Sequence, residues 1–229
     1  MTEFATVQIQ VNEKLYLRNP EQTELGRNII SSSIKLIAEL GFEHFTFKKL
    51  AKDIHSTEAS IYRYFENKHK LLIYLVSWYW SWMEYQVDYM TNNIDDPEKK
   101  LDIVIDILCK SSKFDPQFSH INEDALYEIV IAESSKAYLT KEVDADNKEG
   151  FFLRYKSLCR KISSFVEEMA PEFKYPRALM STIIEASHHQ KFFAEHLPSL
   201  TEVSHNEGGE ADVSEYLRYL VFRLLQENK

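Results

Sequence analysis

The sequence predicts an all-α protein in which a small N-terminal group of three helices precedes a larger C-terminal helical bundle. Apolar residues recur at the spacing of one helix face through most of the 229 residues. A cap residue followed by proline and an acid, which is typical of a helix start, occurs at residues 19–21 and 96–98. Residues 44–71 combine two short amphipathic patterns, a tight polar turn and the start of a third, long helical pattern.

The chain begins with a segment of alternating apolar and polar residues at 4–18. Val7 and Ile9 fall on one side of this pattern, and a polar turn separates them from Leu15 and Leu17. The alternation predicts a short N-terminal β-hairpin or an extended arm. A disordered leader is the alternative, because an isolated two-stranded hairpin is only marginally stable in water.

Two helices are expected between this segment and the polar turn. The first runs from the helix start at residues 19–21 to Gly41, where a left-handed glycine can end it. Thr46 can cap the second, whose apolar residues keep helical spacing as far as Ile54. The first helix is expected to support the second and the third.

The third helix begins at Ser56 or Thr57, and Ile61 and Phe65 stand four residues apart on its inner side. Its outward side chains are mainly small polar groups and tyrosines: Thr57, Glu58, Ser60, Tyr62, Arg63 and Tyr64. Hydroxyls and phenols hydrogen-bond to phosphates and base edges, so this surface suits a helix that enters a groove of duplex DNA. The alternative is that the two tyrosines are partly buried packing residues.

The distribution of charge favours a nucleic-acid partner, although the formal net charge of the chain is −9. Residues 44–70 hold six Lys or Arg against three Asp or Glu, a net charge of +3, so the rest of the chain carries −12. A locally basic head on an acidic body directs a phosphate backbone to one face of the molecule.

Residues 46–51 (TFKKLA) and 56–65 (STEASIYRYF), with Lys68 and Leu71, resemble the DNA-binding segment of TetR/AcrR-type transcriptional regulators. The resemblance covers residues 21–72, a little under a quarter of the chain, and implies a helix-turn-helix domain. It also implies phosphate contacts from Thr46, Tyr64 and Lys68 and an approach of Ser60 and Tyr62 to base edges. The expected DNA-binding set is Thr46, Thr57, Glu58, Ser60, Tyr62, Arg63, Tyr64 and Lys68.

Two positions depart from the family pattern. The family usually has glycine in the turn, where this chain has His55, and often lysine where this chain has Glu58. Histidine tolerates a left-handed backbone less well than glycine but better than a branched residue does. Glu58 can accept a hydrogen bond from a cytosine amino group, or it can simply favour the positive end of its helix. We therefore expect the fold to be kept and the base preference to differ.

A long helix rich in aromatic residues is predicted from residue 68 to about 90, with Asn67 as its cap. Rings at 74, 78, 82, 85 and 89 form one stripe. The rings can be core packing between head and body, or some of them can line a cavity for an apolar or aromatic ligand. The candidate ligand-binding residues are Trp78, Trp82, Tyr85, Tyr89, Tyr127, Tyr155 and His188.

Five further helices complete the expected body. They are predicted at about 97–109, 124–138, 151–169, 176–197 and 213–226. Residues 113–122 are expected to form a loop, 142–149 a solvated acidic connection and 201–212 a flexible link. Tyr216, Tyr219 and Phe222 lie off the main apolar stripe of the last helix, as in a helix covered on two sides. We expect a homodimer through the last two helices, which is also how the resembled family dimerises.

Several classes of protein are disfavoured by composition. Cys109 and Cys159 are too few for a disulfide framework and indicate reduced core residues of a cytosolic protein. The N-terminus lacks the features of a signal peptide, and no apolar run approaches the length that spans a bilayer. The five glycines form no cluster that could cradle a phosphate. We therefore expect a cytoplasmic protein with no membrane partner.

The Glu-x-x-His pattern, which occurs in helical di-metal sites, appears at Glu185 and His188 and again at Glu202 and His205. A di-metal bundle needs such pairs on regular helices, and the second pair falls in the Gly-rich link. No spacing of Ser, His, Asp and Cys supports nucleophilic catalysis. We expect no metal, no cofactor and no catalytic residues, and hence no enzymatic activity.

The sequence thus predicts an arm and helix-turn-helix DNA-binding domain at 1–66 and a helical ligand-binding and dimerisation domain at 67–229. The expected function is sequence-specific transcription regulation, with the protein acting as a repressor on operator DNA. A small apolar or aromatic effector in the C-terminal domain would control its DNA affinity. The alternative is a helical metal-dependent enzyme or apolar-ligand carrier with a vestigial helix-turn-helix head.

Overall fold

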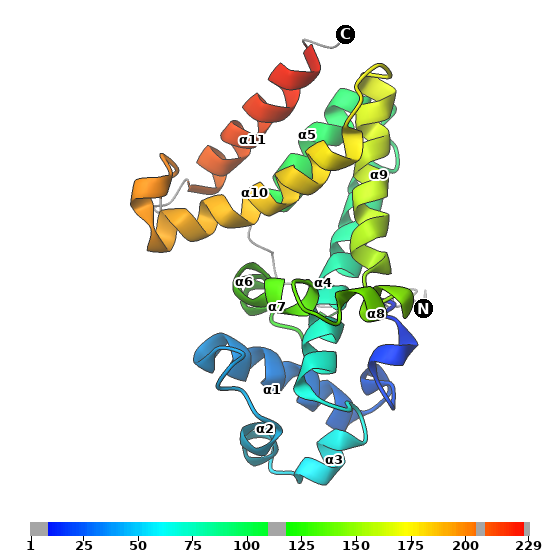
Figure 1. The fold of residues 1–229 in the computed structure, drawn as a ribbon, viewed down its shortest axis with the longest axis vertical. Helices are drawn as coiled ribbons and strands as arrows, with labels where there is room; N and C mark the ends of the chain where they lie inside the picture. The colour runs from blue at the N-terminus through cyan, green and yellow to red at the C-terminus, as the bar shows by residue number, and fades with distance from the viewer. Residues whose placement is uncertain (1–8, 110–117, 205–208, 227–229) are drawn as a thin grey trace, which may run out of the picture. The chain divides into compact units, whose positions relative to one another are not determined.

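A computed structural model describes residues 9–109, 118–204 and 209–226, and every regular element in these ranges is a helix (Figure 1). The all-α prediction is confirmed. The chain forms two compact units, unit 1 from Met1–Trp82 and Ser112–Arg154 and unit 2 from Met83–Ser111 and Tyr155–Lys229. The functional division at residues 66 and 67 stays a prediction.

Unit 1 contains the three predicted N-terminal helices, α1 (Glu24–Leu40), α2 (Phe47–Asp53) and α3 (Glu58–Tyr62). The predicted start at residues 19–21 forms a separate 3-10 turn, η2 (Pro20–Gln22), because the Asn19 side chain caps only that turn. The α-helix then begins after Thr23, whose hydroxyl accepts from the Gly26 N–H.

The predicted hairpin is wrong for the described part of the N-terminus, residues 9–18, and residues 4–8 lie outside the described ranges. Instead of a strand, the segment contains one 3-10 turn, η1 (Glu13–Leu15), because the Asn12 side chain accepts from the Lys14 N–H. The Leu15 side chain is buried, and the Leu17 N–H donates to the Tyr64 carbonyl at 2.8 Å. Residues 9–18, called the arm below, therefore pack onto the other elements of unit 1 as a segment whose only regular element is η1.

The predicted long helix is α4 (Lys68–Thr91), and the Asn67 side chain accepts from the Lys70 N–H in its first turn. Residues 71–82 of α4 are all buried, so the part of this helix in unit 1 is covered on every side. Unit 1 also holds α6 (Glu123–Glu133), α7 (Ser135–Tyr138) and α8 (Val143–Lys148).

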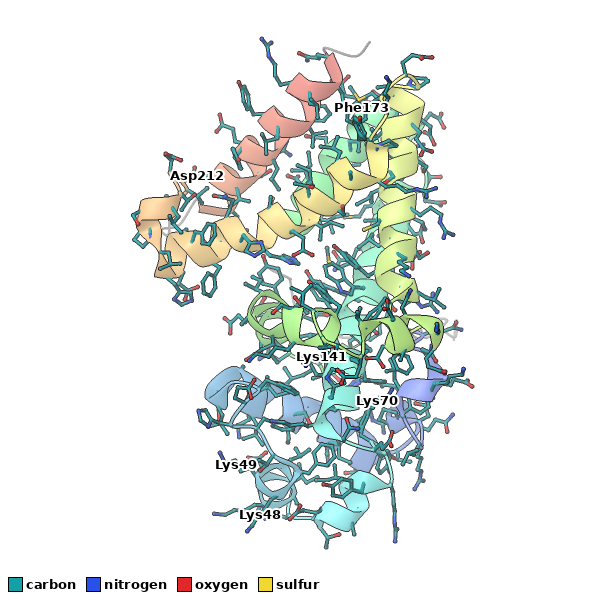
Figure 2. All side chains as sticks on the ribbon, viewed as in Figure 1. Lys48, Lys49, Lys70, Lys141, Phe173 and Asp212 are labelled. Atoms are coloured by element: carbon teal, nitrogen blue, oxygen red, sulfur yellow. The ribbon has the colours of Figure 1, made fainter. Side chains whose placement is uncertain are left out.

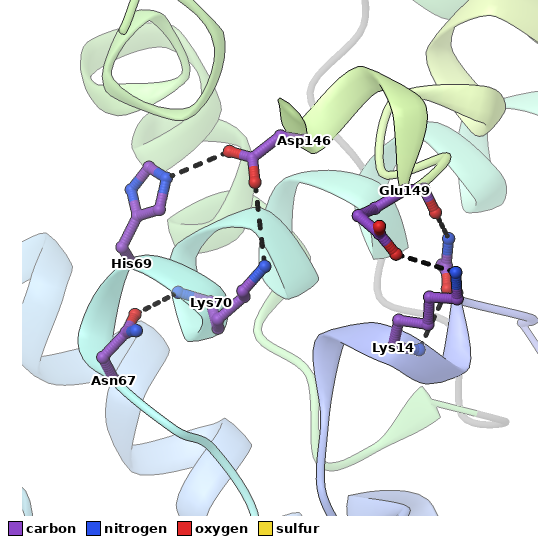
Figure 3. Close-up of polar contacts among 7 residues, drawn as sticks. Lys14, Asn67, His69, Lys70, Asp146 and Glu149 are labelled. Carbon is purple, nitrogen blue, oxygen red and sulfur yellow. Dashed lines mark hydrogen bonds and ion pairs between the residues drawn. The ribbon is translucent and has the colours of Figure 1, made fainter. Parts of the chain in front are cut away.

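The acidic connection predicted at 142–149 is wrong, because this segment forms α8 and buries the Asp146 side chain. The Asp146 carboxylate faces His69 at 3.5 Å and Lys70 at 3.7 Å, both from the first turn of α4 (Figure 3). The Glu149 carboxylate pairs with Lys14 of the arm at 2.7 Å. An acidic run is normally solvated, but here basic side chains distant in sequence compensate two of its carboxylates.

Unit 2 is a bundle of α5 (Pro97–Cys109), α9 (Leu153–Met169), α10 (Pro176–His196) and α11 (Gly209–Gln226), with the last turns of α4. A further turn, η4 (Pro198–Leu200), follows α10. The flexible link expected at 201–212 is wrong at its C-terminal end, because α11 starts at Gly209. Residues 205–208 lie outside the described ranges. The Ser204 N–H donates to the Asp212 carboxylate, which holds the entry to α11.

Candidate nucleic-acid interface

The turn between α2 and α3 is closed by a left-handed residue. His55 has φ +50°, the only positive φ of a non-glycine residue in the described ranges. The Ser56 N–H donates to the Ala51 carbonyl at 2.8 Å and the His55 N–H to the Lys52 carbonyl at 3.3 Å, the two bonds of a Schellman motif. The turn position that departs from the family pattern therefore keeps the backbone conformation for which glycine is preferred.

Helix α3 begins at its predicted cap. The Thr57 hydroxyl accepts from the Ser60 N–H at 3.2 Å and lies 2.9 Å from the Ser60 hydroxyl. Ile61 and Phe65 are fully buried beneath the helix, as predicted. Because α3 is anchored through these apolar side chains, its opposite face is free to meet a partner.

The outward face of α3 is polar and largely exposed. Thr57, Glu58 and Arg63 are exposed, and Ser60 is half-buried. The Tyr62 side chain is 49% exposed, and its ring packs edge-on against Phe47 of α2 with centroids 5.0 Å apart. The ring is thus held against α2 while about half of the residue stays exposed, so Tyr62 is accessible to a base or a phosphate.

The outward placement predicted for Tyr64 is wrong, because its side chain is only 2% exposed. Its hydroxyl lies 2.8 Å from the Thr23 hydroxyl at the cap of α1. Helix α3 ends at Tyr62, so the helical spacing that would have placed Tyr64 outside does not continue. Tyr64 therefore fastens α3 to α1 and presents no surface for a direct phosphate contact.

Lys68 also has a structural role. Its ammonium donates to the Phe42, Glu43 and Phe45 carbonyls at 2.9, 3.2 and 3.3 Å. These bonds match the three N–H donors of the group, so the predicted phosphate contact would require Lys68 to leave at least one carbonyl. In this arrangement Lys68 holds the segment that joins α1 to α2.

Helix α2 contributes a basic surface next to α3. Thr46 is exposed and caps α2 through the Lys49 N–H at 3.2 Å. Lys48, Lys49 and Lys52 are exposed, and Lys48 and Lys49 project from the helix (Figure 2). The expected DNA-binding set did not include these lysines. The signal that could have found them is the same basic excess in residues 44–70.

The candidate ligand residues of unit 1 come together as a packed aromatic core. The rings of Trp78 and Trp82 stack with centroids 6.3 Å apart, and Tyr79 connects them to Tyr127 at 6.2 Å. The Phe118 ring meets Trp78 edge-on at 5.4 Å. Burial raises the pKa of Tyr79, so its phenol stays neutral. The core-packing interpretation fits these rings.

The candidate ligand residues of unit 2 lie in two places. The Tyr155 hydroxyl donates to the Glu185 carboxylate at 3.0 Å, and His188 is buried one helical turn further along α10. Burial lowers the pKa of His188 to about 3, so its imidazole is neutral at physiological pH. Near the end of α4, Tyr85 is half-buried, whereas Tyr89 is 75% exposed and does not line the interior of its unit.

The described residues contain no group of three or more His, Cys, Asp or Glu side chains placed to hold a metal ion. Of the two Glu-x-x-His pairs, Glu185 is engaged by Tyr155, and His205 lies outside the described ranges. Within the described ranges, no helix has both the length and the apolar character needed to cross a membrane.

Comparison with known proteins identifies the N-terminal helices. Residues 29–75 match the model of the bacterial regulatory proteins of the tetR family. The chain carries the N-terminal domain of the TetR family. This TetR-type domain spans most of α1, all of α2 and α3 and the first turns of α4, which confirms the resemblance predicted from the sequence. A search of curated proteins found no match.

Solved structures share the fold over most of the chain. AibR in complex with isovaleryl coenzyme A and operator DNA is 15% identical, with a TM-score of 0.60 over 86% of this chain and 98% of AibR. The fatty acid degradation regulator FadR from Bacillus halodurans is 16% identical, with a TM-score of 0.58 over 85% and 93%. The ketosteroid regulator KstR2 of Mycobacterium tuberculosis is 12% identical, with a TM-score of 0.56 over 94% and 96%. The helices beyond the TetR-type domain therefore also follow the fold of these regulators.

Proposed function

We propose that the protein is a sequence-specific DNA-binding transcriptional regulator, acting as a repressor, whose affinity for its operator is controlled by a small molecule. The observation that carries the proposal is the exposed polar face of α3 on a TetR-type domain. Ile61 and Phe65 anchor that helix from below, and Tyr62 and Ser60 face outward. Such a helix can enter the major groove and meet base edges with its hydroxyls.

The proposal assigns separate roles to the predicted DNA-binding residues. Ser60, Tyr62 and Glu58 approach base edges, and Thr46, Thr57 and Arg63 meet phosphates. Tyr64 and Lys68 act indirectly, because they hold α3 against α1 and hold the segment before α2. The exposed lysines of α2 add sequence-independent attraction to the DNA backbone.

The proposed assembly is a homodimer through α10 and α11. Tyr216, Tyr219 and Leu224 of α11 are 41%, 66% and 39% exposed, which is unusual for large apolar side chains. Tyr216 and Tyr219 stand three residues apart and lie on one side of the helix, away from the buried Leu217. Two helices from each chain would bury this side in a four-helix interface, and the two-fold axis would present two α3 helices to DNA.

The proposed effector is a small, mainly apolar molecule, for which the aromatic and aliphatic side chains of the C-terminal region are suited. The Tyr155–Glu185 hydrogen bond and the neutral His188 are polar groups that could orient such a molecule in unit 2. Two α3 helices fit successive major grooves only when they lie about 34–36 Å apart. An effector that favours another spacing by a few kcal/mol would release the operator.

A selection experiment tests the proposal. The purified protein is used to select duplexes from a pool with a randomised central segment, and the selected duplex is labelled for fluorescence anisotropy. We expect one enriched palindromic sequence, and we expect the pair of substitutions Ser60→Ala and Tyr62→Ala to weaken binding at least about 100-fold, the effect of losing two base contacts. Small apolar and aromatic molecules are then added as candidate effectors, together with isovaleryl coenzyme A, which is bound by AibR and carries an apolar acyl group. Failure to enrich any sequence would contradict the proposal.

A further inference from the structure

The arm places a cationic side chain beside the end of α3. The Leu17 N–H donates to the Tyr64 carbonyl at 2.8 Å, and the buried Leu15 side chain fixes the preceding turn. The Tyr16 ring meets the Tyr74 ring of α4 edge-on, with centroids 6.1 Å apart. Arg18 directly follows Leu17 in the chain. It is therefore held in unit 1 beside Tyr64, which lies two residues after the end of α3.

The Arg18 side chain is suited to bind an anion. Its guanidinium lies over the Tyr64 ring, 5.4 Å from the ring centroid, while the residue as a whole is exposed. The ring therefore supports the side chain and leaves guanidinium N–H groups open to solvent. Within the described part of the chain, no carboxylate forms an ion pair with Arg18.

A second exposed arginine, Arg63, lies at the C-terminal end of α3. Arg63 directly precedes Tyr64 in the chain, is exposed, and likewise forms no ion pair with a described carboxylate. The Tyr64 ring contacts Arg18, and the Tyr64 backbone is bonded to that of Arg63. Neither guanidinium has an acidic partner among the described residues. A guanidinium is planar and can donate two parallel hydrogen bonds to the oxygens of one phosphate, so both side chains are suited to bind the DNA backbone near α3.

We propose that Arg18 is a phosphate-binding residue that contacts the DNA backbone bordering the groove entered by α3. This inference rests on the proposed function and extends the DNA-binding surface to the arm, which lies before the TetR-type domain. In this role Arg18 does not contribute to recognition of the base sequence. It sets the position of α3 along the groove by holding one strand of the backbone.

The test is the salt dependence of binding to the selected duplex, measured by fluorescence anisotropy between about 50 and 200 mM salt. Each lost phosphate contact lowers the slope of log K against log salt concentration by about 0.9. We expect Arg18→Gln to lower the slope by about 0.9 for each protomer and to weaken selected and unrelated duplexes by the same factor. Arg18→Lys keeps a positive charge and should keep most of the slope.

The matched control is Lys14→Gln. Lys14 lies on the same arm, is exposed and carries the same charge, but its ammonium pairs with Glu149, the residue that follows α8. We expect this variant to keep the wild-type slope. If wild-type protein binds the selected duplex and Arg18→Gln leaves both affinity and slope unchanged, the Arg18 inference is overturned while the proposed function stands. An equal loss of slope in Lys14→Gln would also overturn it, since the effect would then be one of net charge. If wild-type protein selects no duplex, the proposed function itself fails.

Discussion

The Glu133 carboxylate at the end of α6 accepts a hydrogen bond from the Phe42 N–H, 3.0 Å away, in the segment that follows α1. Both side chains are buried, so this bond joins α6 to the TetR-type domain inside unit 1. Lys136 pairs with Glu133 at 2.6 Å and with Glu43 at 3.2 Å. These partners raise the pKa of Lys136 and keep its ammonium charged.

We expect Glu133→Ala to lower the free energy of unfolding by about 1–3 kcal/mol, because a buried N–H loses its only strong acceptor. Glu133→Gln keeps an acceptor oxygen for Phe42 and should cost less. Urea denaturation followed by tryptophan fluorescence compares the two variants. Equal destabilisation by both would show that the charge, and not the bond to Phe42, matters at this position.

Substitutions of Tyr62, the last residue of α3, and of Tyr64 should have different effects on stability and on DNA affinity. Tyr64→Phe removes the hydrogen bond to Thr23 and should cost about 1 kcal/mol of stability. Tyr62→Phe keeps the ring packing on Phe47 and should leave stability unchanged, while DNA affinity falls about five- to ten-fold for one lost hydrogen bond. Thermal unfolding and anisotropy are measured on both variants. The opposite pattern would mean that the buried hydroxyl, not the exposed one, reaches DNA.

The turn residue His55 should tolerate glycine well. At φ +50° a side chain is strained, and glycine removes this strain but adds freedom to the unfolded chain. The balance predicts that His55→Gly stabilises the protein by about 0.5–1 kcal/mol, whereas His55→Ala gives no gain. Guanidinium denaturation of the two variants provides the measurement. A loss of stability with glycine would indicate a native contact of the histidine ring.

Buried His188 should make unit 2 sensitive to acid. Burial, with smaller effects of the charges on His189 and Lys191, lowers the pKa of His188 to about 3 in the folded protein. The unfolded chain titrates this group near its usual value of about 6.5, so between about pH 6.5 and 3 the unfolded state binds a proton that the folded state excludes. Stability from His188 is therefore complete above about pH 6.5 and is lost as the pH falls.

The corresponding measurement is the free energy of unfolding at about pH 7.5 and pH 5. His188 should account for up to about 2 kcal/mol of the loss between these values. His188→Gln cannot take up the proton, so its stability should fall less over the same interval. A variant with the same pH dependence as the wild type would show that His188 is not protonated on unfolding in this range.

Features that depend on neighbouring residues in the sequence could be predicted. The caps Thr46 and Thr57 follow from local hydrogen-bonding chemistry, the inward position of Ile61 follows from helical spacing, and the left-handed turn at His55 follows from the resemblance to a family with glycine there. The similarity to TetR-type regulators could be recognised for the same reason, because the motif is contiguous.

Features that depend on distant partners could not be predicted. Spacing alone placed Tyr64 outside, whereas the early end of α3 and the hydroxyl of Thr23 draw it inside. Asp146 appeared solvated because its acidic neighbours are, and its burial depends on His69 and Lys70 from another helix. Lys68 similarly finds three carbonyls more than twenty residues earlier in the chain.

The most direct test of the central claim is hydroxyl-radical footprinting of the selected duplex by the wild-type protein. If two α3 helices of a symmetric dimer enter successive major grooves, the footprint will show matching protected segments on one face of the DNA, about one helical turn or 34–36 Å apart. A single protected segment, or no protection at all, would contradict the account.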